Sequence, residues 1–190
     1  MDEKISLDFH RIHLHITGSV NAALVPYWIN WSRRIYHDLI VTASVTESAC
    51  RFVSIDALKS LTDGKAWIGS WGSDYPIQVH EGLEKYTDVV AIFPASINTI
   101  MQLASGFTNT PMQMAIQLTR LPVSIARAFP GDNNIIEDKL NNLISKRDNI
   151  VISKEMPAYS LSKKSWGGST GFYYPFVLQS LQDLISDLNI

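Results

Sequence analysis

Short apolar runs alternate along the chain with longer segments in which apolar residues recur at helical spacing. The short runs are rich in branched side chains and predict buried strands at 12–16, 38–43, 89–93, 123–128 and 150–152. Helices are predicted between and after them, at 20–35, 46–61, 77–85, 97–104, 111–118, 132–145 and 176–188. Strands that alternate with helices indicate βαβ units, which build a parallel sheet with right-handed crossovers.

The chain has 190 residues, which is enough for one sizeable domain and short for two. It shows no internal repeat, linker or low-complexity segment, so we predict a single α/β domain over residues 1–190. Two segments are expected to be loops. One is 67–76, rich in glycine, serine and tryptophan, and the other is 155–174, which also holds several glycines.

Charge and cysteine content narrow the class of protein. The formal net charge is -2 and the basic residues are scattered, so nothing suggests an electrostatic grip on nucleic acid. The apolar runs are far too short to span a bilayer, and the first residues lack a signal-peptide pattern. We therefore expect a cytoplasmic protein with no membrane partner. The one cysteine, Cys50, is expected to be a small buried residue, and no cysteine–histidine cluster predicts a metal site.

Small polar residues stand where two predicted strands lead into helices. Thr17, Gly18 and Ser19 follow the first strand, and Thr46 and Ser48 stand at the next strand-to-helix junction. A helix start offers free backbone N–H groups and the positive end of the helix dipole, which suits a phosphate group. The alternative is that these hydroxyls only cap helices. The pattern is neither a Walker loop nor a Gly-x-Gly-x-x-Gly motif.

A further polar cluster follows the apolar run at 89–93. It reads Pro-Ala-Ser-Ile-Asn-Thr-Ile over residues 94–100. Open α/β sheets bind their ligands at the carboxyl ends of strands, so this stretch is a candidate binding loop. His80 lies fourteen residues before Pro94.

Three pieces of the chain, in this order, resemble one flavoprotein family. The three are Ile-Thr-Gly-Ser-Val-Asn at 16–21, Thr46 and Ser48 followed by Phe52-Val53, and His80 with the stretch 94–100. Together they resemble the homo-oligomeric flavin-containing cysteine decarboxylases. That family includes the peptidyl-cysteine decarboxylases of lantibiotic biosynthesis and phosphopantothenoylcysteine decarboxylase. The resemblance covers roughly residues 10–150. It implies a three-layer, flavodoxin-like Rossmann domain that binds FMN, and a homo-oligomer, either a trimer or a dodecamer built of trimers.

The resemblance also implies roles for individual residues. FMN would be held by Thr17, Gly18, Ser19, Thr46, Ser48, Pro94, Ala95, Ser96, Asn98 and Thr99. His80 would be the catalytic residue beside the flavin, and a histidine that titrates near neutrality can take the thiol proton. The implied reaction oxidises the C-terminal cysteine of a precursor peptide to a thioaldehyde, which loses carbon dioxide and becomes an enethiol. The remaining histidines are interpreted as structural: His10, His13, His15 and His37.

The chain departs from the family after the strand at 123–128. The family carries Pro-x-Met-Asn there, and its Asn helps to hold the substrate carboxylate. Here the segment reads Arg127-Ala128-Phe129-Pro130, so that a proline replaces the Asn. Divergent members in linaridin and thioamide-peptide pathways also lack this motif. One hypothesis is that Arg127 grips the carboxylate with its planar fork of donors, and the alternative is an arginine in a surface or subunit contact.

The late loop at 155–174 occupies the place of the family's substrate-covering clamp. Trp166, Gly168 and Ser169 are its candidate substrate-binding residues, and the alternative is an ordinary surface or oligomer-contact loop. The loop holds no cysteine, whereas phosphopantothenoylcysteine decarboxylases use one to reprotonate the enethiol. We therefore expect release of the enethiol for an aminovinyl-cysteine ring. The alternatives are phosphopantothenoylcysteine decarboxylase, a silent FMN-binding regulatory subunit, and a nucleotide-binding domain without flavin.

Overall fold

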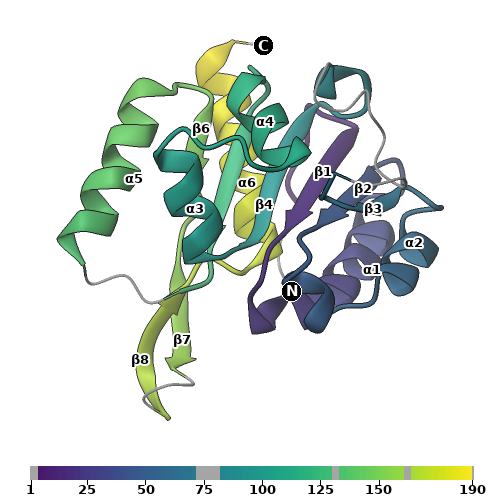
Figure 1. Cartoon of the computed structure of the whole chain (residues 1–190). Helices are drawn as coiled ribbons and strands as arrows, with labels where there is room; N and C mark the ends of the chain where they lie inside the picture. The colour runs from purple at the N-terminus through teal and green to yellow at the C-terminus, as the bar shows by residue number, and fades with distance from the viewer. Residues whose placement is uncertain (1–3, 72–81, 130–132, 161–163, 190) are drawn as a thin grey trace.

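The computed structural model describes residues 4–71, 82–129, 133–160 and 164–189, and six parallel strands form the sheet in this part of the chain. The strand order is β3-β2-β1-β4-β5-β6, and Figure 1 shows helices on both sides of the sheet. The strands are β1 (Arg11–Ile16), β2 (Ile40–Val45), β3 (Ala66–Ile68), β4 (Val89–Ala95), β5 (Val123–Arg127) and β6 (Ile150–Ile152). The parallel α/β fold predicted from the sequence is confirmed.

The helices divide between the two faces of the sheet. One hydrophobic cluster packs α1, α2 and α6 against the sheet, and a second packs α3, α4 and α5 against the opposite face. The helices are α1 (Val25–Ile35), α2 (Ile55–Leu61), α3 (Ile97–Ala104), α4 (Pro111–Leu118), α5 (Asn134–Lys146) and α6 (Tyr174–Leu188). Three layers result, as expected for this fold class.

The sequence of the central strand β4 is apolar at every position because both faces of this strand are covered. Val89, Ala91 and Phe93 belong to the cluster on the α1 and α6 side, while Val90 and Ile92 belong to the cluster on the other side. Successive side chains of a strand point to opposite faces, and both faces are covered. All seven residues of β4 are therefore buried.

The predicted helix at 46–61 is wrong in its first half. A short 3-10 turn, η2 (Ala49–Arg51), comes first, and α2 begins only at Ile55. Ser54 starts the helix because its hydroxyl accepts a hydrogen bond from the backbone N–H of Asp56 at 3.2 Å. The expectation for Cys50 is also wrong, since its side chain on this turn is exposed.

Two strand segments were not predicted. β3 is only three residues long and lies in the segment expected to begin a loop. The expected loop at 155–174 contains an antiparallel hairpin, β7 (Met156–Ser160) and β8 (Ser165–Thr170), which extends away from the sheet in Figure 1.

Part of the predicted helix at 77–85 lies outside the described residues. What is described there is a short 3-10 turn, η4 (Leu83–Lys85). The predicted helix at 20–35 begins as the 3-10 turn η1 (Val20–Leu24) and continues as α1, with Pro26 in its first turn. Among the described helices, none has the length and apolar character needed to cross a bilayer.

Candidate functional site

The loops after β1, β2 and β4 meet at one edge of the sheet. β1 lies between β2 and β4: the chain runs from β1 to β2 and β3 on one side, and then crosses to β4, β5 and β6 on the other side. Open α/β sheets bind ligands at such a switch point, outside the carboxyl ends of the strands. The predicted cofactor residues therefore come together here.

Gly18 touches the loop after β2. A side-chain carbon placed on Gly18 would lie 2.5 Å from Ser48 Oγ and 2.9 Å from Ser48 Cβ, so that only glycine fits. Thr46 Oγ1 lies 3.1 Å from Ser48 Oγ, and the Thr46 N–H donates to the Ile16 carbonyl at 2.9 Å. Both predicted phosphate loops thus form one small cradle with backbone and hydroxyl donors.

Thr17 lies in the predicted loop, but its hydroxyl does not have the role predicted for a cofactor ligand. Its hydroxyl is buried, donates to the Pro94 carbonyl at 2.7 Å and accepts from the Ser96 N–H at 2.7 Å. The Thr17 N–H also donates to the Pro94 carbonyl, at 3.2 Å. Since a hydroxyl has only one proton to donate, Thr17 joins the loops after β1 and β4 and does not offer its proton to a ligand.

The stretch 94–100 turns from β4 into α3. Ser96 caps the helix: its hydroxyl accepts from the Thr99 N–H at 3.5 Å and donates to Thr99 Oγ1 at 3.1 Å. Asn98 is exposed on the first turn, while Ala95 is fully buried. Ser19 also caps, since its hydroxyl accepts from the Asn21 N–H at 3.3 Å. Ser19 therefore caps a helical turn, as the capping alternative predicted, and Ser96 caps α3 in the same way.

The hairpin β7–β8 walls a cavity beside Ser19. The cavity has a volume of about 400 Å³ and joins the start of η1 to the end of β5 and the hairpin. Its lining comprises Ser19, Val20, Asn21, Ala128, Phe129, Ala158, Tyr159, Ser160, Gly168, Ser169 and Thr170. Gly168 and Ser169 therefore line a cavity, and their role in binding a substrate stays a prediction. Trp166 is 75% exposed, and its ring meets Tyr159 edge-on with centroids 6.0 Å apart.

Two residues of the sequence hypotheses lie outside the described residues. They are His80 and Pro130, so the catalytic role of His80 stays a prediction. Arg127 is described at the end of β5, and its guanidinium already has carboxylate partners. Nη2 lies 2.9 Å from Glu137 Oε1, and Nε lies 3.2 Å from Glu155 Oε1.

Sequence reasoning did not foresee a buried polar row on β1 and β2. His13 Nδ1 lies 2.8 Å from Thr42 Oγ1 and its Nε2 lies 2.8 Å from Ser44 Oγ, which also lies 2.9 Å from His15 Nδ1. Burial lowers the pKa of His15 to about 4. Burial, with a smaller effect of the neighbouring His15 charge, lowers the pKa of His13 to about 3. Both rings are therefore neutral near pH 7, which agrees with a structural role.

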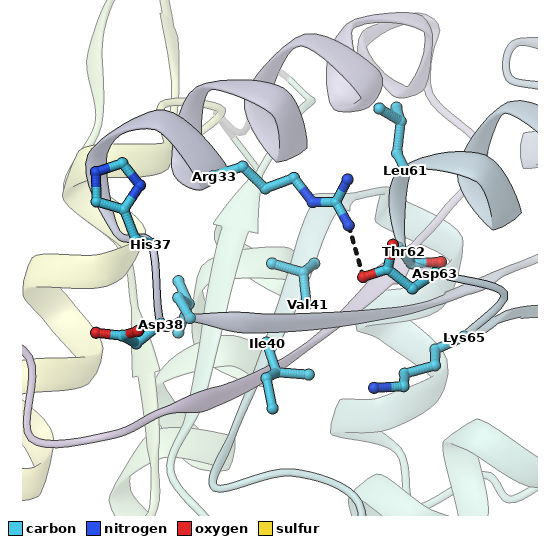
Figure 2. Close-up of a pocket in the computed structure, with 10 residues that line it drawn as sticks. Arg33, His37, Asp38, Ile40, Val41, Leu61, Thr62, Asp63 and Lys65 are labelled. Carbon is cyan, nitrogen blue, oxygen red and sulfur yellow. Dashed lines mark hydrogen bonds and ion pairs between the residues drawn. The ribbon is translucent and has the colours of Figure 1, made fainter.

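A second cavity, of about 280 Å³, lies at the amino end of β2. Figure 2 shows the ion pair between Arg33 and Asp63 that crosses it, with Nη2 and Oδ2 2.7 Å apart. None of the predicted site residues lines this cavity, which lies at the edge opposite the cradle. Within the described ranges, no group of three or more histidine, cysteine or acidic residues is arranged to hold a metal ion.

The amino-acid sequence is similar to those of known proteins. A sequence model described as Flavoprotein matches residues 2–158. A curated Streptomyces protein, the cypemycin cysteine dehydrogenase (decarboxylating), is 38% identical over 168 residues, which is 88% of this chain and 87% of that protein.

Solved structures match the fold over nearly the whole chain. The crystal structure of the cypemycin decarboxylase CypD matches with a TM-score of 0.84 and 32% identity, covering 99% of this chain and 100% of that one. The FMN-dependent cysteine decarboxylase SpaF matches with a TM-score of 0.68 and 20% identity, over 92% of this chain and 96% of that one. At that identity the second likeness concerns the fold alone.

Proposed function

Since the chain belongs to the flavoprotein family, we propose that it uses FMN to decarboxylate oxidatively a C-terminal cysteine of a precursor peptide. The observation that carries this proposal is the junction of the loops after β1, β2 and β4 beside a cavity walled by a hairpin. Similarity to the cypemycin cysteine dehydrogenase (decarboxylating) supports the same reaction class. The product is an enethiol, which serves to form an aminovinyl-cysteine group.

The residues at the cradle fit a flavin mononucleotide. Gly18 lets the loop after β1 pack directly against Ser48 of the next loop, where a side chain on residue 18 would clash. Backbone N–H groups at such loop ends, with nearby hydroxyls, are suited to a phosphate. Asn98 is exposed on the first turn of α3, where its amide can meet polar atoms of the ring. In this proposal the buried residues Thr17, Pro94, Ala95 and Thr99 shape the site from behind, and Ser19, Thr46, Ser48 and Asn98 face the flavin.

The chain's own residues bind and orient the peptide. In the proposal the end of the peptide enters the cavity beside Ser19, next to the cradle, and Gly168 and Ser169, which line that cavity, cover it from the hairpin. Bound flavin supplies the two-electron oxidation that converts the cysteine to a thioaldehyde. The thioaldehyde stands β to the carboxylate and accepts the electron pair when carbon dioxide leaves. In the proposal His80 takes the thiol proton.

The expected product remains an enethiol because the hairpin offers no thiol to reprotonate it. Residues 155–174 contain no cysteine, and Cys50 lies on η2, after β2. This favours a peptidyl-cysteine substrate over the coenzyme A pathway substrate.

We propose a homo-oligomer as the working form. Large apolar side chains are exposed along η1 and α1, with Val20 50%, Leu24 54% and Tyr27 59% accessible. A run of exposed apolar residues is typical of an association surface. The cytoplasmic location expected from the sequence stays a prediction.

Mass spectrometry of peptides that end in cysteine tests the proposed reaction. Incubation with the flavin-loaded protein in air should remove one carbon dioxide and two hydrogens, and H80N should not. Turnover of phosphopantothenoylcysteine in place of peptides would support the coenzyme A pathway alternative. Bound flavin without any mass change across a varied panel would support the silent regulatory subunit.

A further inference from the structure

Arg127 lies at the root of the hairpin and is held by two acidic residues from different segments. Its Nη2 and Nη1 atoms lie 2.9 and 3.4 Å from the two carboxylate oxygens of Glu137 on α5. Its Nε atom lies 3.2 Å from Oε1 of Glu155, which precedes β7, as an ion pair without hydrogen-bond alignment. The Arg127 side chain is only 11% exposed.

Both ends of the hairpin reach Arg127. At the first end, Glu155 pairs with the guanidinium, and its second carboxylate oxygen accepts a hydrogen bond from Ser169 on β8. At the other end, the Gly171 N–H donates to the Arg127 carbonyl at 2.7 Å. A side-chain carbon on Gly171 would lie 2.8 Å from the Arg127 backbone nitrogen, so the chain passes very close to β5 there.

Arg127 also connects the hairpin to the candidate cofactor loop. It pairs in register with Ala95, the last residue of β4, and the next residue, Ala128, donates its N–H to the Ala95 carbonyl at 3.1 Å. The backbone at the hairpin root is therefore hydrogen-bonded, through β5, to the residue that precedes Ser96.

The charges around Arg127 argue against a third carboxylate at the same guanidinium. One positive charge already faces the negative charges of Glu137 and Glu155. A peptide carboxylate that joined them would meet net repulsion at short range in a poorly solvated place. The two Nη atoms are engaged by Glu137 and Nε faces Glu155, so the fork of donors is not free to bind a substrate carboxylate.

We propose that Arg127 is a positioning residue, which clasps the hairpin over the cavity through Glu155 while Glu137 fixes the orientation of the guanidinium. The inference rests on the proposed function, since it assigns a role in peptide binding. Opening the hairpin would leave a mostly buried cation with one partner fewer, which favours the position seen here. A peptide binds the clasped form, so its apparent affinity falls with the clasped fraction.

The test uses the flavin-loaded protein and a pair of cysteine-ending peptides, one with a free carboxylate and one with a C-terminal amide. E155Q keeps the shape of the side chain and removes its charge, and D63N is the matched control in the ion pair at the far edge of the sheet. E155Q should weaken binding of both peptides roughly tenfold, about 1.4 kcal/mol, with kcat nearly unchanged. R127K should behave in the same way, because lysine cannot reach both partners with a planar fork. D63N should have no effect.

Two results would overturn the clasp. If E155Q strengthened binding of the free acid alone while R127K abolished the preference for acid over amide, Arg127 would be a carboxylate ligand. If neither variant changed the binding of either peptide, the ion pair would have no role in positioning.

Hydrogen exchange separates this inference from the proposed function. Peptides from β7 and β8 should exchange faster in E155Q than in the unchanged protein, with or without turnover. Faster exchange in a protein that modifies no peptide would keep the clasp and refute the proposed reaction. Unchanged exchange in an active enzyme would refute the clasp alone.

Discussion

The Thr17 hydroxyl lies 2.7 Å from the Ser96 backbone nitrogen, and this hydrogen bond joins the loop after β1 to the first turn of α3. The same hydroxyl donates to the Pro94 carbonyl, so both of its functions are used inside the protein. The two loops, which the resemblance assigns to FMN binding, are therefore one connected structure.

Thr17→Val should disturb both loops at once. Valine has nearly the same shape but leaves the partly buried Ser96 N–H without its acceptor, which costs about 1 kcal/mol. The measurement is chemical denaturation together with a flavin titration, and both stability and flavin affinity should fall. T17S, which keeps the hydroxyl, is the control. Equal flavin affinity in T17V and the unchanged protein would contradict the connection.

Gly18→Ala should abolish flavin binding because the new methyl group would lie 2.5 Å from Ser48 Oγ. A second substitution, at Ser48, should relieve the clash. Removing the whole side chain in the double variant G18A/S48G clears both contacts and should restore part of the affinity, as read from flavin absorbance of the purified protein. Two results would contradict the described contact between Gly18 and Ser48. One is a G18A protein that keeps its flavin, and the other is a G18A/S48G protein that binds flavin no better than G18A.

Acid should destabilise the fold through the buried histidines. Their folded-state pKa values, about 3 for His13 and about 4 for His15, lie below the ordinary 6.5, so the unfolded chain binds more protons in acid. Their contribution is fully present above about pH 6.5 and is lost as the pH falls toward 4, by up to about 1.4 kcal/mol per unit for each ring.

Denaturant titrations across this range check the prediction. H15Q should flatten the decline in stability, because it removes one titrating group. H37Q, at an exposed position, should leave the slope unchanged. An identical slope in all three proteins would show that the buried pair does not control acid stability.

Gly171→Ala should move the hairpin away from β5. Its methyl group would lie 2.8 Å from the Arg127 nitrogen and 3.3 Å from Ala126 backbone atoms, which cannot swing aside. We expect a higher KM for the peptide and a loss of about 1–3 kcal/mol in stability, as for other overpacked sites. G69A, whose methyl group would find its nearest neighbour at 3.6 Å, is the control. A G171A enzyme with unchanged KM would mean that the close approach is unimportant.

Much of the fold could be predicted where local pattern and burial agree. The helices at 97–104 and 111–118 and the strand at 150–152 have the predicted bounds. Local residues fix where the two helices begin: Ser96 caps the first, and Pro111 is the first residue of the second. In β4 a continuous apolar run leaves few alternatives to a buried strand.

The errors lie where pairing between distant segments decides the structure. β3 is a strand because it pairs with β2, and β8 pairs with β7 despite Gly167 and Gly168, which have low strand propensity. The sequence order of strands and helices predicted that the loops at 17–19 and 46–48 would be neighbours. It carried no information that Glu137 and Glu155 would surround Arg127, because these contacts depend on tertiary packing.

The most direct test of the account is a single turnover without oxygen. Flavin-loaded protein is mixed with excess peptide that ends in cysteine, and flavin absorbance and peptide mass are followed together. The account predicts bleaching of the oxidised flavin and, for each flavin bleached, one peptide that has lost carbon dioxide and two hydrogens. Bound flavin that stays oxidised while a panel of peptides keeps its mass would contradict oxidative decarboxylation by this protein.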